Sequence, residues 1–156
     1  MEPWGTRSAR EGHLEVLGRD ACLALLAAVT VGRLAWPAPG GRPEVVPVNF
    51  VLDGGDLVFR ISRRGGEITA VEHGVPLSFE ADDLEPALRV GWSVLVSGRA
   101  AVVTGAAEIR RLEELAGAPW VALPEPVFVR LRAEEVTGRR LPLHPGGVTV
   151  ESPGQG

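Results

Sequence analysis

The sequence contains no lysine and no tyrosine, and all 16 of its basic residues are arginines. Without lysine the chain cannot form a Schiff base, and a phosphate site must use arginine, backbone N–H groups or hydroxyls. The single cysteine, Cys22, excludes an internal disulfide and any metal cluster built on several cysteines. It lies in an apolar stretch, where we expect a buried, inert thiol rather than a nucleophile.

Long apolar segments are also missing. No run approaches the ~18–20 residues that span a bilayer, and the polar first residues do not resemble a secretory signal. The 20 acidic and 16 basic residues give a net charge of −4, which disfavours nucleic acid and acidic membranes as partners. We therefore expect a cytoplasmic protein with no membrane and no nucleic-acid partner.

The sequence also lacks the common catalytic and metal-binding motifs. Its three histidines are scattered, with no HxxxH or HExxH spacing, so we expect no metal site. No GxSxG, Walker A or GxGxxG motif is present. No catalytic residue can therefore be named from motifs.

What the sequence does contain is a pattern of short strands. Its 156 residues suit one domain with a real core. The clearest feature is a hairpin over residues 43–62, whose arms are separated by Asp53-Gly54-Gly55-Asp56. Short helices are predicted over residues 20–28, 67–74 and 105–117.

Four further strands complete the prediction of about six. Two are predicted over residues 29–36 and 75–84. Two longer ones are predicted over residues 91–104, with a bulge or bend at Gly98, and over residues 126–141. Because most successive strands have no crossover helix between them, we expect a mainly β fold, an antiparallel barrel with peripheral helices.

The ends of the chain are polar or rich in proline and glycine. We predict a disordered N-terminal arm over residues 1–12, the barrel domain over residues 13–141 and a flexible C-terminal tail over residues 142–156.

Asn49 is the only asparagine, and it lies within a strand pattern two residues after Pro47. Pro47 lacks a donor for the hydrogen-bond ladder, so this strand should be an edge or be interrupted there. Exposed backbone groups and the Asn49 amide could then bond the ring atoms of a planar heteroaromatic ligand. The alternative is an exposed or locally bonded asparagine at a strand bend.

Trp92 and Ser93 open one of the longer predicted strands and form a second candidate. An aromatic side chain there could wall a flat ligand or fill a subunit interface. The alternative is a tryptophan that caps the barrel core.

The stretch FRISRRGGEITAVEHG, residues 59–74, joins a predicted strand to a short helix and is the third candidate. Alternation should turn Arg60 and Ser62 away from Phe59 and Ile61. The two arginines and two glycines that follow could cradle an anion, because glycine permits positive φ and arginine binds phosphate in bidentate fashion. The alternative is an ordinary basic surface turn.

Four segments taken in order resemble the pyridoxamine 5'-phosphate oxidase-like flavoproteins, in particular the small actinobacterial type. They are VTVGRLAW, VVPVNFVLDGGDLVFR, VPLSFEADDLEPALRVGWSVLVSGRA and VRLRAEEVTGRR. The resemblance runs from about Leu17 to Leu141. It implies an FMN-binding split β-barrel, usually a homodimer with two flavin sites across the subunit interface.

The resemblance also implies the residues of a flavin site. Those expected along the flavin ring are Pro47, Val48 and Asn49. Those expected along the ribityl-phosphate path are Arg60, Ile61 and Ser62. Those expected in the phosphate turn include Arg63, Arg64, Gly66 and Ile68, and those expected to close the site from near the interface are Trp92 and Ser93.

One departure from the family concerns the phosphate turn. Relatives commonly read Gly-Thr-Lys where this chain has Gly65, Gly66 and Glu67. Glu67 would repel a phosphate, which carries about −1.5 to −2 charges, if it pointed into the pocket. Alternatively it would face solvent in the first turn of the helix, while Arg63 or Arg64 supplied the missing charge.

The resemblance implies a flavin-dependent oxidoreductase acting on an unidentified small molecule, with FMN as the first choice of cofactor and a deazaflavin as the second. Pyridoxamine phosphate itself is not the expected substrate, because the chain shows no basic site for a second phosphate. The alternative function is a non-catalytic split-barrel dimer with weakened or lost flavin binding, serving as a ligand-binding or interaction module. Gly66 and Glu67 favour this alternative, whereas Asn49, Trp92 and Ser93 favour the oxidoreductase.

Overall fold

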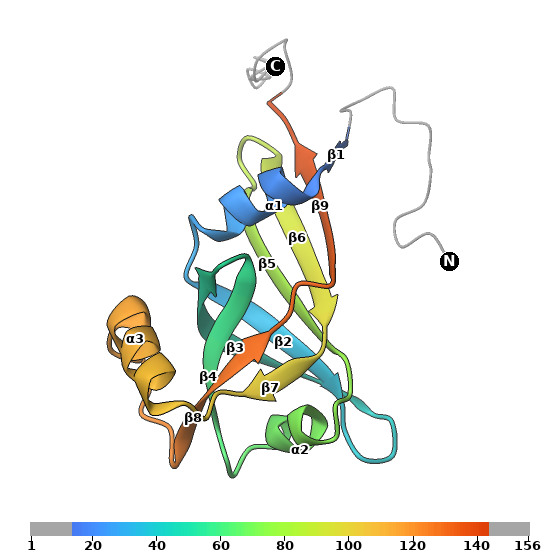
Figure 1. The fold of residues 1–156 in the computed structure, drawn as a ribbon. Coiled ribbons are helices and arrows are strands. Elements are labelled where there is room, and N and C mark those ends of the chain that lie inside the picture. Colours follow the sequence, from blue (N-terminus) through green and yellow to red (C-terminus); the bar gives the residue numbers. More distant parts are fainter. Residues whose placement is uncertain (1–13, 144–156) are drawn as a thin grey trace, which may run out of the picture.

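The computed structural model describes residues 14–143, which form a curled β-sheet with three short helices at its margins (Figure 1). The helices are α1 (Arg19–Leu26), α2 (Glu67–Glu72) and α3 (Ala106–Ala116). The three predicted helices are thus confirmed with small shifts at their ends. The predicted N-terminal arm and most of the predicted C-terminal tail lie outside the described residues.

The strands pair in the order β1-β9-β6-β5-β2-β3-β4-β8-β7, and all of these pairings are antiparallel. Their bounds are β1 (Glu15–Leu17), β2 (Val31–Pro37), β3 (Pro43–Asp53), β4 (Asp56–Ser62), β5 (Leu77–Glu85), β6 (Val90–Gly98), β7 (Ala100–Val102), β8 (Pro126–Leu131) and β9 (Glu135–Leu141). The mainly β fold and the antiparallel split barrel expected from the sequence are confirmed.

Both long strands predicted in the second half of the chain are divided at one corner of the barrel. The bend predicted at Gly98 is confirmed, since β6 ends there, but the prediction of one strand over residues 126–141 is wrong. β6 pairs with β9 whereas β7 pairs with β8, so both chain segments pass together from one half of the curled sheet to the other. A Cβ atom on Gly98 would clash with the carbonyl oxygen of Arg132, so only glycine permits this close crossing.

β3 changes its pairing partner next to Asn49. Residues up to Asn49 pair with β2, and residues from Phe50 onward pair with β4. Pro47 therefore lies where β3 is paired on one side only, which accommodates its missing N–H. The edge predicted from Pro47 is confirmed for this half of the strand, although β3 itself is continuous.

Strand alternation builds the main core inside the curled sheet. Phe59 and Ile61 of β4 are 2% and 1% exposed, and Phe50 of β3 pairs with Phe59 across the ladder. The rings of Phe50 and Phe79 meet edge to face, with centroids 4.7 Å apart. Residues next to these aromatics on β3 and β4 consequently point to the outer side of the sheet.

A second, smaller cluster attaches α3 to that outer side. Its buried members are Val58, Val103, Leu112 and Phe128. α3 therefore stands over β4 and β8, and it brings the segment that follows it close to β3 and β4. No helix within residues 14–143 is long and apolar enough to cross a membrane.

Candidate functional site

A cavity of about 440 Å³ lies on the outer side of β3 and β4, under the segment that follows α3. Its lining comes from residues 46–51 of β3, residues 58–61 of β4, residues 116–123, and the single residues Thr30, Glu67 and Phe128. Most of these side chains are apolar, and the charged ones are Arg60 and Glu67. Cavities of this size, apolar with a few polar groups, are typical of small-molecule sites.

Five of the residues predicted to contact a cofactor line this cavity, namely Pro47, Val48, Asn49, Arg60 and Ile61. For Asn49 and Arg60 the reason is the register, because their neighbours Phe50 and Phe59 face the core and these two side chains therefore face outward. The half-buried Asn49 side chain forms no hydrogen bond to any group in residues 14–143. Its amide remains available to a ligand.

Arg60 crosses one side of the cavity. Its Nη2 atom donates a hydrogen bond of 2.7 Å to the carbonyl oxygen of Gly117, just after α3. Its guanidinium carbon lies 4.6 Å from the centre of the Phe128 ring, which is the geometry of a cation–π contact. Arg60 thus joins β4 to the segment that covers the cavity.

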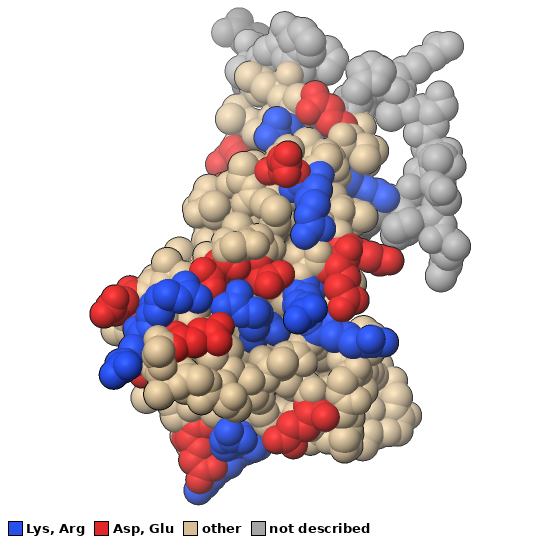
Figure 2. All heavy atoms as spheres, viewed as in Figure 1, with Lys and Arg blue, Asp and Glu red and all other residues tan. Residues whose placement is uncertain are grey.

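A network of charged side chains fixes α3 to the β3–β4 hairpin. Both Asp53 carboxylate oxygens accept hydrogen bonds from Arg111, at 2.9 and 2.7 Å, and one also accepts from Arg130 at 2.6 Å. Arg130 also donates to Glu108 at 2.9 Å. The hydrogen bonds from Arg111, and to a smaller extent the one from Arg130, hold the pKa of Asp53 well below its usual range. Figure 2 shows the resulting mixture of acidic and basic side chains beside α3.

The segment from Ala118 to Leu123 forms the outer wall of the cavity, and the sequence analysis did not identify it. Trp120 is 71% exposed and Val121 is 67% exposed, yet both line the cavity. A large apolar surface left open to solvent at a cavity mouth is typical of a binding site. The signal in the sequence was the apolar run APWVAL, placed between a helix and a strand where a polar loop would be usual.

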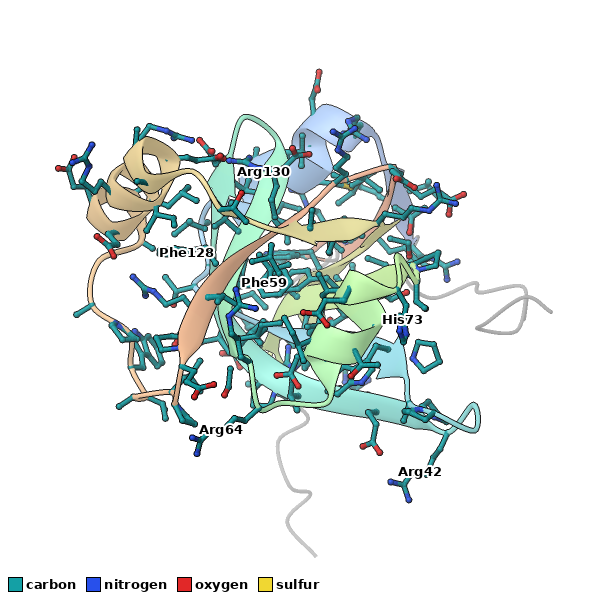
Figure 3. All side chains as sticks on the ribbon, turned by 60° about the horizontal axis from the view of Figure 1, so that its bottom comes forward. Arg42, Phe59, Arg64, His73, Phe128 and Arg130 are labelled. Atoms are coloured by element: carbon teal, nitrogen blue, oxygen red, sulfur yellow. The ribbon has the colours of Figure 1, made fainter. Side chains whose placement is uncertain are left out.

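The two arginines of the predicted phosphate turn point away from the cavity. Arg63 pairs with Glu72 at 4.0 Å, and Arg64 pairs with Glu125 at 3.4 Å. The Arg64 side chain is 71% exposed and projects from the edge of the molecule in Figure 3. In this arrangement the turn resembles the ordinary basic surface turn that was the alternative interpretation.

The remaining predicted residues of the turn have structural contacts. The buried Ser62 hydroxyl donates to the carbonyl oxygen of Pro124 and accepts from the backbone N–H of Arg64. Ile68 is 7% exposed and belongs to the core. Gly66 has a helical φ of −70°, and Gly65 is not among the glycines with positive φ, so the positive φ expected at this turn is not used.

Glu67, in contrast, does line the cavity. A Cβ atom built on Gly65 would lie 2.5 Å from its Oε2 atom and 2.9 Å from its Oε1 atom, so the carboxylate folds back over the turn. One of the two expected arrangements had Glu67 facing solvent while Arg63 or Arg64 supplied the positive charge. The structure shows the opposite arrangement, with Glu67 in the cavity lining and both arginines outside it.

Trp92 and Ser93 are not brought to this cavity within one chain. Trp92 lines a second cavity of about 350 Å³ together with Asp83 and Arg140, at the end of β6 and β9. Ser93 lies beside it and pairs with Asp82 and with β9.

The outer face of the sheet next to the first cavity holds a cluster of three charged residues. Arg33 of β2, which pairs with Pro47 in the ladder, lies 3.3 Å from Glu80 and 3.4 Å from Asp82. Burial, together with the hydrogen bond and charge of Asp82, raises the pKa of Glu80 to about 7 despite the opposing effect of Arg33.

Two other expectations concern reactive groups. Cys22 is fully buried, as expected, and burial raises the pKa of its thiol. Within residues 14–143, no group of three or more His, Cys, Asp or Glu side chains could hold a metal ion.

The cavity offers a planar ligand an apolar slot, the free amide of Asn49 and a strand edge, and its described wall carries no acid–base pair.

Comparison with known proteins places this geometry in a family. The family model described as pyridoxamine 5'-phosphate oxidase matches residues 18–140. An uncharacterized protein of Mycobacterium tuberculosis, Rv0080, is 34% identical over 147 residues, which cover 90% of this chain and 95% of that protein.

Two solved structures are similar over most of the chain. A putative pyridoxamine 5'-phosphate oxidase from Corynebacterium glutamicum has a TM-score of 0.70 and 26% identity, covering 87% of this chain and 99% of that one. An FAD-binding protein from Mycobacterium smegmatis has a TM-score of 0.67 and 27% identity, covering 81% of this chain and 97% of that one. With the split barrel and a matching family model over residues 18–140, the chain belongs to the pyridoxamine 5'-phosphate oxidase family.

Proposed function

We propose that this protein is a flavin-dependent oxidoreductase whose isoalloxazine ring lies in the cavity between β3, β4 and the segment from Ala118 to Leu123. The observation that carries the proposal is the pairing switch of β3 at Asn49, which leaves a strand edge and an amide facing an apolar slot. Flavin binding by a structural relative at 27% identity supports the same assignment. When bound, the flavin supplies hydride or electron transfer.

The chain's own residues would hold and orient the ring. Asn49 is suited to donate and accept hydrogen bonds at the polar edge of the ring. Val48 and Val51 line the slot on the β3 side, and Trp120 offers a broad apolar surface at its mouth. These groups would exclude water from one face of the ring, which leaves the other face for a small substrate.

The fit is good for the ring and poor for a phosphate. Besides Arg60, which already bonds to Gly117, no basic side chain in residues 14–143 lines the cavity. FMN is the flavin that the family resemblance implies, with Ser62, Arg63, Arg64, Gly66 and Ile68 near its phosphate. FMN is therefore the first cofactor to be tested, and a deazaflavin is the second.

We further propose a homodimer formed through the outer face of β2, β3, β5 and β6. This face carries the exposed apolar side chains of Val45 on β3 and Leu95 on β6, where Leu95 pairs with Glu80, and it adjoins the cavity at Pro47. A second copy seated there would bring its Trp92 and Ser93 toward the cavity, as the family resemblance implies. The cytoplasmic location expected from the sequence stays a prediction.

One observation favours the second candidate function, a non-catalytic split-barrel dimer with weakened flavin binding. Glu67 lines the cavity where a cation would hold a phosphate, and Arg63 and Arg64 are paired elsewhere. Such a protein would act as a ligand-binding or interaction module.

The visible spectrum of the purified protein, before and after addition of riboflavin or FMN, tests the proposal. We expect flavin absorbance bands or saturable quenching of flavin fluorescence, and reduction of the bound flavin by a nicotinamide or another small donor. Flavin binding without turnover of any donor would favour the second candidate. Absence of absorbance and of quenching with both flavins would contradict flavin binding altogether.

A further inference from the structure

Glu67, the first residue of α2, contributes a negative charge to the lining of the cavity. It is one of two charged residues in the lining, and the other, Arg60, is already engaged with Gly117 and Phe128. In residues 14–143 the Glu67 carboxylate has no ion pair and no side-chain hydrogen bond. A ligand group that approaches this end of the cavity therefore meets an uncompensated carboxylate.

The cations nearest in sequence do not offset this carboxylate. Arg63 and Arg64 pair with Glu72 and Glu125 and are absent from the cavity lining. Each arginine thus already lies near a carboxylate that competes with the cavity for its charge.

We infer that Glu67 is a specificity-determining residue that discriminates against a terminal phosphate monoester. The favoured ligand is a flavin without a phosphate at this turn, namely riboflavin. This inference rests on the proposed flavin site. It follows from charge, since the phosphate monoester of FMN carries about −1.5 to −2 charges, whereas riboflavin carries none. Like charges placed face to face in a partly buried site lower affinity substantially.

The test compares dissociation constants for riboflavin and FMN, measured by flavin fluorescence on the full chain. For the wild-type protein, riboflavin should bind more tightly than FMN. Glu67→Gln should raise the affinity for FMN by about tenfold and change that for riboflavin by less than about threefold. Higher salt should raise the affinity of the wild-type protein for FMN, because it screens the repulsion.

Two matched variants control for net charge and for the arginines. Glu114→Gln removes a carboxylate from the exposed side of α3, away from the cavity lining, and should leave both dissociation constants unchanged. Arg64→Ala should also leave the affinity for FMN unchanged, because Arg64 lies outside the cavity.

The outcomes separate this inference from the proposed function. Suppose that riboflavin binds and that the ratio of FMN to riboflavin affinity is the same in the wild-type and Glu67→Gln proteins. This result would overturn the inference but not the proposed flavin site. A large loss of FMN affinity in Arg64→Ala would overturn it as well, since the arginines would then hold the phosphate. Failure of every flavin to bind would overturn both.

Discussion

The guanidinium of Arg60 lies 4.6 Å from the centre of the Phe128 ring, and the same group donates to the carbonyl oxygen of Gly117. A central strand, a neighbouring strand and the end of α3 are thereby joined at the edge of the cavity.

Replacement of Arg60 should therefore loosen the cavity. Arg60→Ala removes the cation–π contact and leaves the Gly117 carbonyl without its donor, and we expect a loss of about 1–2 kcal/mol in the free energy of unfolding. Riboflavin affinity should fall as well, because Ala118 to Leu123 would lose their support. Chemical denaturation and a riboflavin titration of the same variant check both effects. An unchanged stability would show that the Arg60 contacts are not formed in solution.

Acid should weaken the attachment of α3. The pKa of Asp53 is lowered in the folded chain by Arg111 and then Arg130. Because the pKa of Asp53 is lower in the folded chain than in the unfolded chain, the ionised carboxylate stabilises the fold at pH values above the unfolded pKa of about 3.9. This contribution is lost as the pH falls below that pKa. Asp53→Asn should cost about 1–2 kcal/mol at neutral pH, and progressively less below about pH 4. Urea denaturation across this pH range measures the difference, and a difference independent of pH would contradict the pairing.

The opposite pH dependence is expected from Glu80, whose folded pKa of about 7 lies above the usual value for glutamate. An acid with a raised pKa in the folded state destabilises the fold as pH rises from the unfolded pKa toward the folded one. Glu80→Gln should therefore stabilise the chain by roughly 1 kcal/mol at about pH 8 and by nothing below about pH 4, since the group is a third exposed. Thermal unfolding of both proteins at the two pH values tests this, and equal stabilisation at both would contradict it.

The barrel corner at Gly98 gives a prediction about folding alone. Gly98→Ala places a methyl group against the carbonyl oxygen of Arg132, and we expect a destabilisation of about 1–3 kcal/mol. Gly66→Ala is the matched control, because Gly66 has a helical φ and its nearest atoms would be 3.8 Å from the new methyl group. That change should be neutral or stabilise by about 0.4–1 kcal/mol. Equal effects of the two substitutions on the urea midpoint would show that the strands do not cross closely at Gly98.

Much of the fold was predictable because local patterns determine it. Alternation gave the hairpin of β3 and β4 and the outward direction of Arg60, and Pro47 indicated where β3 is unpaired. The division of the last strand was not predictable, because its cause is the close passage of Arg132 by Gly98. That contact joins residues far apart in the sequence, and nothing in the pattern of residues 126–141 indicates it.

The candidate site was predictable only in its strand residues. Asn49 and Arg60 could be placed by register, but the role of residues 118–123 depends on how α3 docks on the hairpin through Asp53. The direction of Arg64 is likewise set by Glu125, which is distant in sequence. A turn rich in arginine and glycine therefore indicates an anion site only where no acidic side chain from elsewhere in the fold, such as Glu125, pairs with its arginines.

The most direct test of the flavin site is a riboflavin titration of the wild-type protein beside two tryptophan variants. Ala118→Trp fills the cavity from its exposed wall, whereas Ala107→Trp places the same bulk on the solvent side of α3, outside the cavity lining. We predict saturable quenching of riboflavin fluorescence by the wild-type and Ala107→Trp proteins, and a loss of affinity of at least about tenfold in Ala118→Trp. Equal riboflavin affinity in all three proteins would contradict the assignment of the flavin to this cavity.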